Sequence, residues 1–410
     1  MTGEAALRRL LDRALPQRIM TLIAAGGGEA RLVGGVVRDV LNGADPDHLT
    51  DLDMAVNRPP QECRDLLEAH GFRVIPTGID HGTITVVDHH HAAVKVELTS
   101  LRADIRTDGR HAEVVFGTDW EADAERRDFT INALYLAADG SIFDPLGGRE
   151  DLAAGRVRFV GMAAPRIRED YLRMLRFFRF HARFGRGAPD AEAMAAISEH
   201  SPGLDRISGE RIAQEMRGIL AAGHAAAISA MITTGLDRSI ARDGFDDDGY
   251  DRLMAFVPRV DPMHLLGFLI RGQDTDAVAA RLRLSRREAG VLQRAADPDA
   301  YQAFGEQGWA AAAYGASRDA AMTPAVMAGL YAVAAVAAGG DVSAEAFGRL
   351  HGWRRPQFPI TGDDLIDRGM APGQAMGRCL KALEHRWIDA GFTPDREALL
   401  KILDAGGLNE

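Results

Sequence analysis

The secondary-structure pattern of this sequence changes once along the chain, and that change limits what the chain can fold into. Residues 30 to about 145 alternate short β-rich runs with helical or turn-like pieces. Beyond about residue 160, Ala, Leu, Arg and Glu recur at helical spacing, interrupted by clusters of Gly, Pro and Asp. The β-rich runs are RLVGG, DLDMAV, FRVIPT, GTITVVD, AVKVELTSL and FTINALYLA. We therefore predict an α+β fold, in which a mixed sheet with helices is followed by an all-α part.

Composition and charge are those of an ordinary globular protein with one unusual segment. A chain of 410 residues exceeds what one hydrophobic core usually serves, so we expect two to four packed units. The net charge of −11 argues against a protein that coats nucleic acid indiscriminately, but not against one local basic site. Residues 156–186 form a basic segment, with nine arginines and two acidic residues. Such a segment either binds polyphosphate or RNA, or is a solvated helix with paired arginines.

The cysteines and the N-terminal stretch bear on location. The chain has two cysteines, Cys63 and Cys379, which are far apart in the sequence, and this usage fits a reducing compartment. Residues 1–20 scatter charges among leucines, which predicts an amphipathic helix and not a signal peptide. The longest apolar run, residues 326–338, is too short to span a bilayer. We expect a cytoplasmic protein that does not bind membranes.

Two aspartates in the run TDLDMAV are the first candidates for chemistry. Asp51 and Asp53 flank Leu52, and in a strand residues i and i+2 point to the same face. Two carboxylates on one face can hold two Mg²⁺ ions for in-line phosphoryl transfer. One ion would lower the pKa of an attacking hydroxyl, and the other would neutralise the leaving pyrophosphate. Alone, this pattern is also typical of turn or edge-strand acids.

A glycine pair stands a short way before these aspartates. Gly34 and Gly35 end a predicted strand in RLVGGVVRD, and a helix is expected to follow. A strand that turns into a helix at glycine exposes backbone N–H groups suited to phosphate oxygens. Arg38, one turn into that helix, could meet the same triphosphate. An ordinary strand–turn–helix junction is the alternative for this segment.

Taken together, these motifs resemble the bacterial tRNA nucleotidyltransferase and poly(A) polymerase family. G-G-x-x-R-D followed by D-x-D is typical of the nucleotidyltransferase superfamily, and further family motifs follow in order over about residues 30–220. They are RRDFTIN at 126–132, DPLGGREDL at 144–152, REDYLRMLR at 168–176 with Arg179 and Phe180 beyond it, and ISGERIAQEM at 207–216.

The resemblance implies a domain order and a reaction. It implies a palm-like nucleotidyltransferase head over residues 1–145, a nucleotide-selecting and RNA-binding neck over 146–220, and a helical body and tail over 221–410 that bind tRNA. The implied activity is template-independent addition of CCA to the 3′ end of tRNA from CTP and ATP. Mg²⁺ would be the cofactor, and tRNA, ATP and CTP the partners, with no obligate protein partner evident.

The resemblance also assigns roles to individual residues. Asp51 and Asp53 would be catalytic and would bind the metal. The nucleotide would be bound by residues from the glycine turn, the RRDFTIN motif and the neck, namely Gly34, Gly35, Arg38, Arg127, Asp128, Asn132, Asp170, Arg173, Arg176 and Arg179.

The choice of C and A has a physical explanation that uses only two of these residues. Asp170 and Arg173 are spaced i, i+3, which would place them on one face of a helix. A carboxylate accepts hydrogen bonds, whereas a guanidinium only donates them. Cytosine and adenine both show an amino donor beside a ring-nitrogen acceptor, whereas guanine and uracil show the reverse order. An Asp–Arg pair would therefore match C and A and leave polar groups unpaired on G and U, at roughly 1–3 kcal/mol each.

Weaker signals leave alternatives open. Glu97 matches a family position for a further carboxylate but is equally typical of an edge strand, and residues 81–83 (HGT) fit architecture near the site. The histidines at 89–91 indicate a hairpin turn more than a metal site. A polar loop between residues 101 and 117 resembles one that helps relatives switch from C to A. The segment ITGDDLIDRGMAPG resembles tRNA-type members, and the C-terminus is not basic, which favours tRNA over the alternative of a poly(A) polymerase or an A-only enzyme. A non-catalytic RNA-binding relative is the other alternative.

Overall fold

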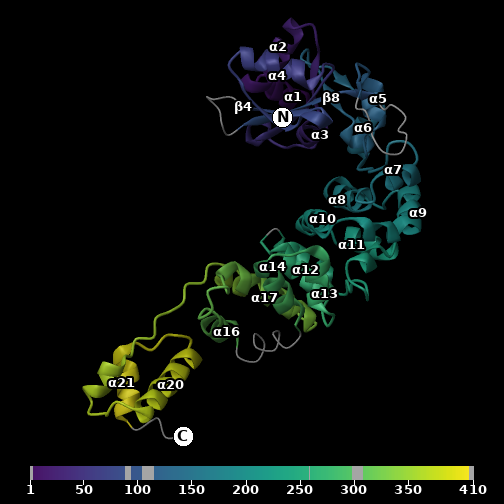
Figure 1. Ribbon diagram of the computed structural model, residues 1–410. Helices are drawn as coiled ribbons and strands as arrows, with labels where there is room; N and C mark the ends of the chain where they lie inside the picture. The colour runs from purple at the N-terminus through teal and green to yellow at the C-terminus, as the bar shows by residue number, and fades with distance from the viewer. Residues whose placement is uncertain (1–2, 88–93, 104–114, 258, 298–307, 406–410) are drawn as a thin grey trace. The chain divides into compact units, whose positions relative to one another are not determined.

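The computed structural model describes residues 3–87, 94–103, 115–257, 259–297 and 308–405 (Figure 1). The chain divides into two compact units, residues 1–206 and residues 207–410. The division into head, neck, body and tail drawn from the sequence stays a prediction. Within the described residues, no helix combines the length and the apolar character needed to cross a membrane.

The first unit is built on a seven-stranded mixed sheet, which confirms the α+β fold predicted from the sequence. The strand order is β3-β4-β5-β2-β1-β8-β9, so the DLDMAV strand lies in the middle. The strands are β1 (Ala30–Val33), β2 (Asp51–Val56), β3 (Arg73–Gly78), β4 (Thr83–Val87), β5 (Lys95–Ser100), β8 (Tyr135–Leu136) and β9 (Ile142–Phe143). A separate pair, β6 (Arg102–Ala103) and β7 (Val115–Phe116), forms a two-stranded ladder.

Helices surround this sheet and continue beyond it in the first unit (Figure 1). They are α1 (Gly3–Leu11), α2 (Ala14–Ala25), α3 (Gly35–Leu41), α4 (Pro60–Ala69), α5 (Trp120–Glu125), α6 (Gly148–Ala154), α7 (Ala163–Glu169), α8 (Arg173–Phe184) and α9 (Ala191–His200). Short 3₁₀ turns are η1 (Pro46–His48), η2 (Ile79–His81), η3 (Thr130–Asn132) and η4 (Ser201–Arg206). The single amphipathic helix expected over residues 1–20 is in fact the pair α1 and α2.

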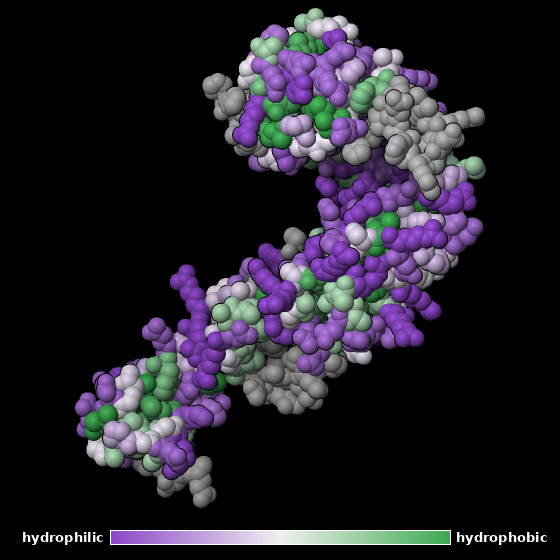
Figure 2. Space-filling model, viewed as in Figure 1, coloured by the Kyte–Doolittle hydropathy of each residue, from purple (hydrophilic) through white to green (hydrophobic). Residues whose placement is uncertain are grey.

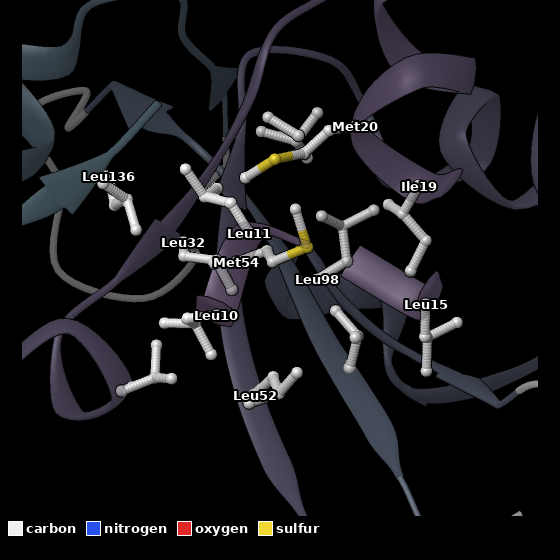
Figure 3. Close-up of a cluster of buried hydrophobic side chains, with 14 of the residues drawn as sticks. Leu10, Leu11, Leu15, Ile19, Met20, Leu32, Leu52, Met54, Leu98 and Leu136 are labelled. Carbon is white, nitrogen blue, oxygen red and sulfur yellow. The ribbon is translucent and has the colours of Figure 1, made fainter. Parts of the chain in front are cut away.

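The two faces of β2 carry different side chains. Leu52 and Met54 are fully buried and pack in a core with residues of α1, α2 and α4, as Figure 3 shows for its α1 and α2 members. Asp51 and Asp53 lie on the opposite, exposed face. Ala55, farther along that same face, is buried in a second cluster with Val33 and Tyr135. The period of two in the sequence therefore separates the core from the candidate site.

One predicted strand is mostly wrong. In FTINALYLA only Tyr135 and Leu136 form a strand, and Thr130–Asn132 form the turn η3. The side chains of this turn explain the departure, because they make polar contacts across the unit instead of alternating between two faces. Thr130 donates to Asp151 at 2.7 Å, and Asn132 donates to Asp128 at 2.9 Å.

The second unit consists of helices, as the loss of strand signal predicted. They are α10 (Gly209–Ala221), α11 (Ala225–Thr233), α12 (Pro262–Leu269), α13 (Thr275–Leu282), α14 (Arg286–Ala296), α16 (Trp309–Ala316), α17 (Pro324–Ala337), α18 (Ala344–His351), α19 (Gly362–Ile366), α20 (Gln374–Asp389) and α21 (Arg396–Asp404), with 3₁₀ turns η5 (Leu236–Ser239) and η6 (Tyr250–Phe256). Tyr314 of α16 packs with Trp387 of α20 and Leu399 of α21 in one core. Figure 2 shows that the face drawn is mainly hydrophilic, with apolar residues in smaller spots.

Candidate active site

The two aspartates of β2 are neighbours on the exposed face of the sheet. β2 runs parallel to β5, and the register pairs Asp51 with Lys95 and Asp53 with Glu97. Lys95 lies 2.9 Å from the Asp51 carboxylate in an exposed ion pair. Three acidic side chains and one lysine therefore project from adjacent positions of the same face.

The charge of Asp53 is strongly affected by its surroundings. Desolvation, together with the charges of Glu97 and Asp51, raises the pKa of Asp53 to about 6, against the opposing charges of Arg127 and Arg38. The carboxylates repel one another, so a cation placed between them would be stabilised. Crowded carboxylates of this kind are typical of metal-binding and catalytic sites.

The donor set fits Mg²⁺, which proteins usually bind through one or two carboxylates together with substrate phosphates. Among the described residues, no group of three or more His, Cys, Asp and Glu side chains is arranged to hold a metal ion. Glu97 therefore affects the charge of Asp53 without completing a three-carboxylate cluster. The pair Asp51 and Asp53 is the part of this face that could bind the metal.

The glycine turn lies directly beside the carboxylates. β1 ends at Val33, and Gly34 has φ 66° and ψ −120°, a conformation that other residues avoid. A Cβ atom on Gly34 would lie 3.4 Å from Nη1 of Arg127. One on Gly35 would lie 3.6 Å from Nη2 of Arg38 and 3.9 Å from Oδ2 of Asp53. The turn therefore brings two guanidinium groups close to the face of β2 that carries the carboxylates.

A chain of polar contacts runs from this turn to helix α8. Arg38, 5% exposed, donates to Asp39 at 2.9 Å and to the side-chain oxygen of Asn132. The amide nitrogen of Asn132 donates to Asp128 at 2.9 Å. Asp128 also accepts from Nε of Arg176 at 2.7 Å. The side-chain oxygen and nitrogen of Asn132 are thus both engaged within the protein.

The guanidinium of Arg127 is fixed by two residues that the sequence did not identify. Asp123 accepts from Arg127 at 3.0 and 3.2 Å, and the Tyr135 hydroxyl accepts from it at 2.9 Å. Asp123 lies four residues before Arg127 on the preceding helix, and that spacing was the only sequence signal for the contact.

The helix that the sequence predicted to carry both Asp170 and Arg173 is broken between them. α7 ends at Glu169, Asp170 is extended with φ −153°, and α8 begins at Arg173. Asp170 and Arg173 therefore do not share a helix face, and the i, i+3 argument is wrong at this point. The cause is local: the Asp170 carboxylate accepts from the backbone N–H of Leu172 at 3.1 Å, which competes with helix formation. The turn nevertheless keeps the two residues adjacent, because Arg173 N donates to Asp170 O at 3.0 Å.

The basic segment is partly neutralised within the first unit. Arg173 uses Nη1 for Glu169 and for the carbonyl of Arg166, while its Nε and Nη2 make no hydrogen bond to another described residue. Arg179 lies over the ring of Phe180 at 4.4 Å. Six arginines of the basic segment form ion pairs with nearby acidic side chains. They are Arg156, Arg158, Arg166, Arg173, Arg176 and Arg183, and their partners are Glu150, Asp151, Glu169, Asp128 and Asp39. Ion pairs within the first unit thus account for a large part of the positive charge of residues 156–186.

The DPLGGREDL motif has a structural explanation. Asp144 accepts from the backbone of Gly148 and Arg149 at the start of α6. A Cβ on Gly148 would lie 2.2 Å from the carbonyl oxygen of Thr130, so only glycine fits. Asp151, fully buried, accepts from Thr130 and from Arg158 at 2.6 Å.

Of the weaker signals, Glu97 lies beside the site, paired in register with Asp53. HGT forms the end of η2 and the start of β4, with Gly82 in the left-handed region. The histidines at 89–91 and residues 104–114 of the polar loop lie outside the described residues.

Comparison with known proteins shows which family the chain is similar to. Residues 30–158 match the family described as "Poly A polymerase head domain", and residues 188–241 match "Probable RNA and SrmB- binding site of polymerase A". The chain is 35% identical to "CCA tRNA nucleotidyltransferase 1, mitochondrial" of Homo sapiens, over 92% of this chain and 86% of that protein. It is 31% identical to the "CCA-adding enzyme" of Lacticaseibacillus paracasei, over 94% of each.

Solved structures share the fold along the whole chain. The Thermotoga maritima CCA-adding enzyme complexed with tRNA has a TM-score of 0.69 at 19% identity, over 98% of both chains. The Bacillus stearothermophilus CCA-adding enzyme in complex with CTP has a TM-score of 0.65 at 24% identity, over 95% of this chain and 96% of that one.

A carboxylate pair on the central strand, beside a Gly-Gly turn and two arginines, defines the class of nucleotidyltransferases. Within that class, the chain belongs to the family of CCA tRNA nucleotidyltransferases and poly(A) polymerases.

Proposed function

We propose that this protein adds CCA to the 3′ end of tRNA from CTP and ATP and releases pyrophosphate. The observation that carries the proposal is the position of Asp51 and Asp53 on an exposed face, with the Gly34–Gly35 turn beside Asp53 and the guanidinium of Arg38 beside that turn. Relatives that are named for CCA addition match more than nine-tenths of the chain and support the tRNA substrate.

The residues around the turn would bind the incoming nucleotide. Gly34 and Gly35 allow phosphate oxygens to approach the backbone closely. Arg127 and Arg38 would neutralise the triphosphate, because both guanidinium groups lie beside the turn. Asp128 and Asn132 would keep Arg38 and Arg176 in place through the hydrogen bonds that they make.

Asp51 and Asp53 would hold Mg²⁺, which would supply an activated nucleophile and neutralise the charge of the leaving pyrophosphate. The attacking group is the 3′-terminal hydroxyl of the RNA. The face of β2 orients the two carboxylates, and the arginines orient the triphosphate, so that hydroxyl, phosphorus and pyrophosphate come into line.

Asp170 and Arg173 would read the base. The carboxylate of Asp170 would accept from the exocyclic amino group of C or A, and Nε or Nη2 of Arg173 would donate to the neighbouring ring nitrogen. The turn at residues 170–172 would set the distance between acceptor and donor, with Arg176 and Arg179 supporting α8. With G or U, the Asp170 carboxylate would face a carbonyl oxygen, and the Arg173 guanidinium would face a ring N–H, so neither hydrogen bond could form.

We propose that helices of the second unit bind tRNA through its backbone and shape, which needs few base-specific contacts. A cytoplasmic location is part of the proposal, because Cys63 and Cys379 are free thiols, as expected in a reducing compartment.

Nucleotide incorporation tests the proposal. Purified protein is incubated with Mg²⁺, a tRNA that lacks its last three nucleotides, and labelled CTP or labelled ATP separately. CTP incorporation is the expected result, and it excludes both a poly(A) polymerase and an A-only enzyme. Incorporation of ATP alone would establish one of these instead, and incorporation of neither nucleotide would indicate a non-catalytic RNA-binding protein.

A further inference from the structure

The guanidinium of Arg127 is held from one side by two buried side chains. We propose that Asp123 and Tyr135 are positioning residues, which fix this guanidinium beside the glycine turn so that its remaining N–H groups meet the triphosphate. The inference rests on the proposed function of Arg127 and adds the residues through which its position is set.

The three side chains form a closed set of hydrogen bonds. Oδ2 of Asp123 accepts from Nε and Nη2 of Arg127 at 3.2 and 3.0 Å. The Tyr135 hydroxyl accepts from Nε of Arg127 at 2.9 Å and donates to the same Asp123 oxygen at 2.7 Å. Each residue thus contacts the other two, which fixes the orientation of the guanidinium plane.

Burial and charge make this arrangement rigid. The side chain of Asp123 is 1% exposed, and Tyr135 is fully buried. Desolvation tends to raise the pKa of Asp123, but the charges of Arg127 and Arg126 and the Tyr135 hydroxyl outweigh it, so the pKa is lowered. Asp123 therefore stays ionised and offsets part of the charge of Arg127, while its other carboxylate oxygen accepts from Arg126. Hydrogen bonds between charged groups are shorter and stronger than neutral ones.

The backbone ties this cluster to the glycine turn. Tyr135 of β8 pairs with Val33 of β1, the residue before Gly34. The backbone N–H of Gly34 donates to the carbonyl of Leu134 at 3.0 Å. A change in the position of Tyr135 would therefore move Arg127 relative to the turn.

Arg127 keeps donors for a ligand after these contacts are made. A guanidinium has five N–H groups. The bonds to Asp123 and Tyr135 use Nε and one N–H of Nη2, and Nη1 makes a long 3.4 Å contact to the carbonyl of Asn132. At least one N–H on each terminal nitrogen has no partner among the described residues. Two such donors in a fixed fork match a pair of phosphate oxygens.

Tyr135→Phe tests the inference, because it removes one hydroxyl and keeps the ring. Steady-state kinetics with CTP and with ATP should show KM raised about tenfold for both, with kcat changed much less, since a hydrogen bond to a charged group is lost. The inhibition constant of inorganic tripolyphosphate should rise by the same factor. Tyr314→Phe in the second unit is the matched control. It removes a hydrogen bond from a tyrosine hydroxyl to Glu384 that is 2.7 Å long, the same length as the bond from Tyr135 to Asp123. It should leave both constants unchanged.

A double variant separates positioning from general damage. In an Arg127→Ala background, Tyr135→Phe should raise KM less than twofold further, because the group that it positions is gone. The inference is overturned if Tyr135→Phe leaves KM unchanged, if it lowers only kcat, or if its effect persists in full without Arg127.

Calorimetric binding of ATP to the unmodified protein and to Tyr135→Phe tests the same inference without turnover, and about tenfold weaker binding is expected. If the unmodified protein incorporated no nucleotide, the proposed function would fail while this binding result still decided the positioning role.

Discussion

Asp53→Asn should make the protein more stable while abolishing its activity. The shift of the Asp53 pKa from 3.8 to about 6 means that folding disfavours the charged form. Two pKa units correspond to about 3 kcal/mol for a fully buried group. Asp53 has exposed surface, so solvent screening reduces the expected gain to about 1 kcal/mol at pH 8.

The size of this stabilisation depends on pH. Because the folded-state pKa is raised, the penalty is absent below pH 3.8, grows as the pH rises and is complete above pH 6. The increase in the free energy of unfolding caused by Asp53→Asn should therefore be larger at pH 8 than at pH 5.

Thermal unfolding in EDTA at both pH values measures this gain. A gain of about 1 kcal/mol corresponds to a rise in Tm of about 2–4 °C for a domain of this size. Asp51→Asn is the control. It loses the exposed ion pair with Lys95 and removes only one of the smaller contributions to the raised pKa of Asp53, so it should stabilise the protein less than Asp53→Asn. An unchanged or lowered Tm for Asp53→Asn at pH 8, or an equal gain at both pH values, would refute the reasoning.

Three further changes should have distinct effects. Asp170→Ala should reduce the preference for C and A over U and G, measured by competition among the four labelled nucleotides; an intact preference would contradict the base-reading role. Asp364→Asn should lower the urea midpoint of the second unit at pH 7, because the backbone N–H of Thr361 and the guanidinium of Arg396 hold the pKa of Asp364 at about 2. This stabilisation is lost as the pH falls from 4 to 2, and an unchanged midpoint at pH 7 would refute it. Gly148→Ala should lower Tm by several degrees or prevent folding, because its Cβ would lie 2.2 Å from a backbone oxygen; a Tm within one degree of the unmodified protein would contradict this.

Local patterns in the sequence predicted much of the fold. The alternation in DLDMAV placed Leu52 and Asp53 on opposite faces, because the period of a strand is a property of the backbone. Beyond residue 160 the strand pattern ends and residues recur at helical spacing, and this change predicted the helical second unit. The α+β fold is confirmed, whereas the roles of the site residues stay predictions.

Contacts between distant elements could not be predicted in this way. The bond from Tyr135 to Asp123 joins β8 to α5, and only the folded sheet brings these elements together. The break at Asp170 has a local signal in the sequence, since an aspartate that bonds a nearby backbone N–H favours a helix start over a helix interior. The polar side chains of the turn at 130–132 interrupted a predicted strand for a similar reason.

The central claim is that Asp51 and Asp53 hold the divalent cation that supports nucleotide transfer. Mn²⁺ binding, followed by electron paramagnetic resonance in the presence of CTP, tests it in the unmodified protein, in Asp51→Asn and in Asp53→Asn. Asp363→Asn, at an exposed position of the second unit, is the control. We expect Mn²⁺ binding and CTP incorporation to be lost together in the first two variants and kept in the third. Binding of Mn²⁺ with unchanged affinity after loss of either carboxylate would contradict the account.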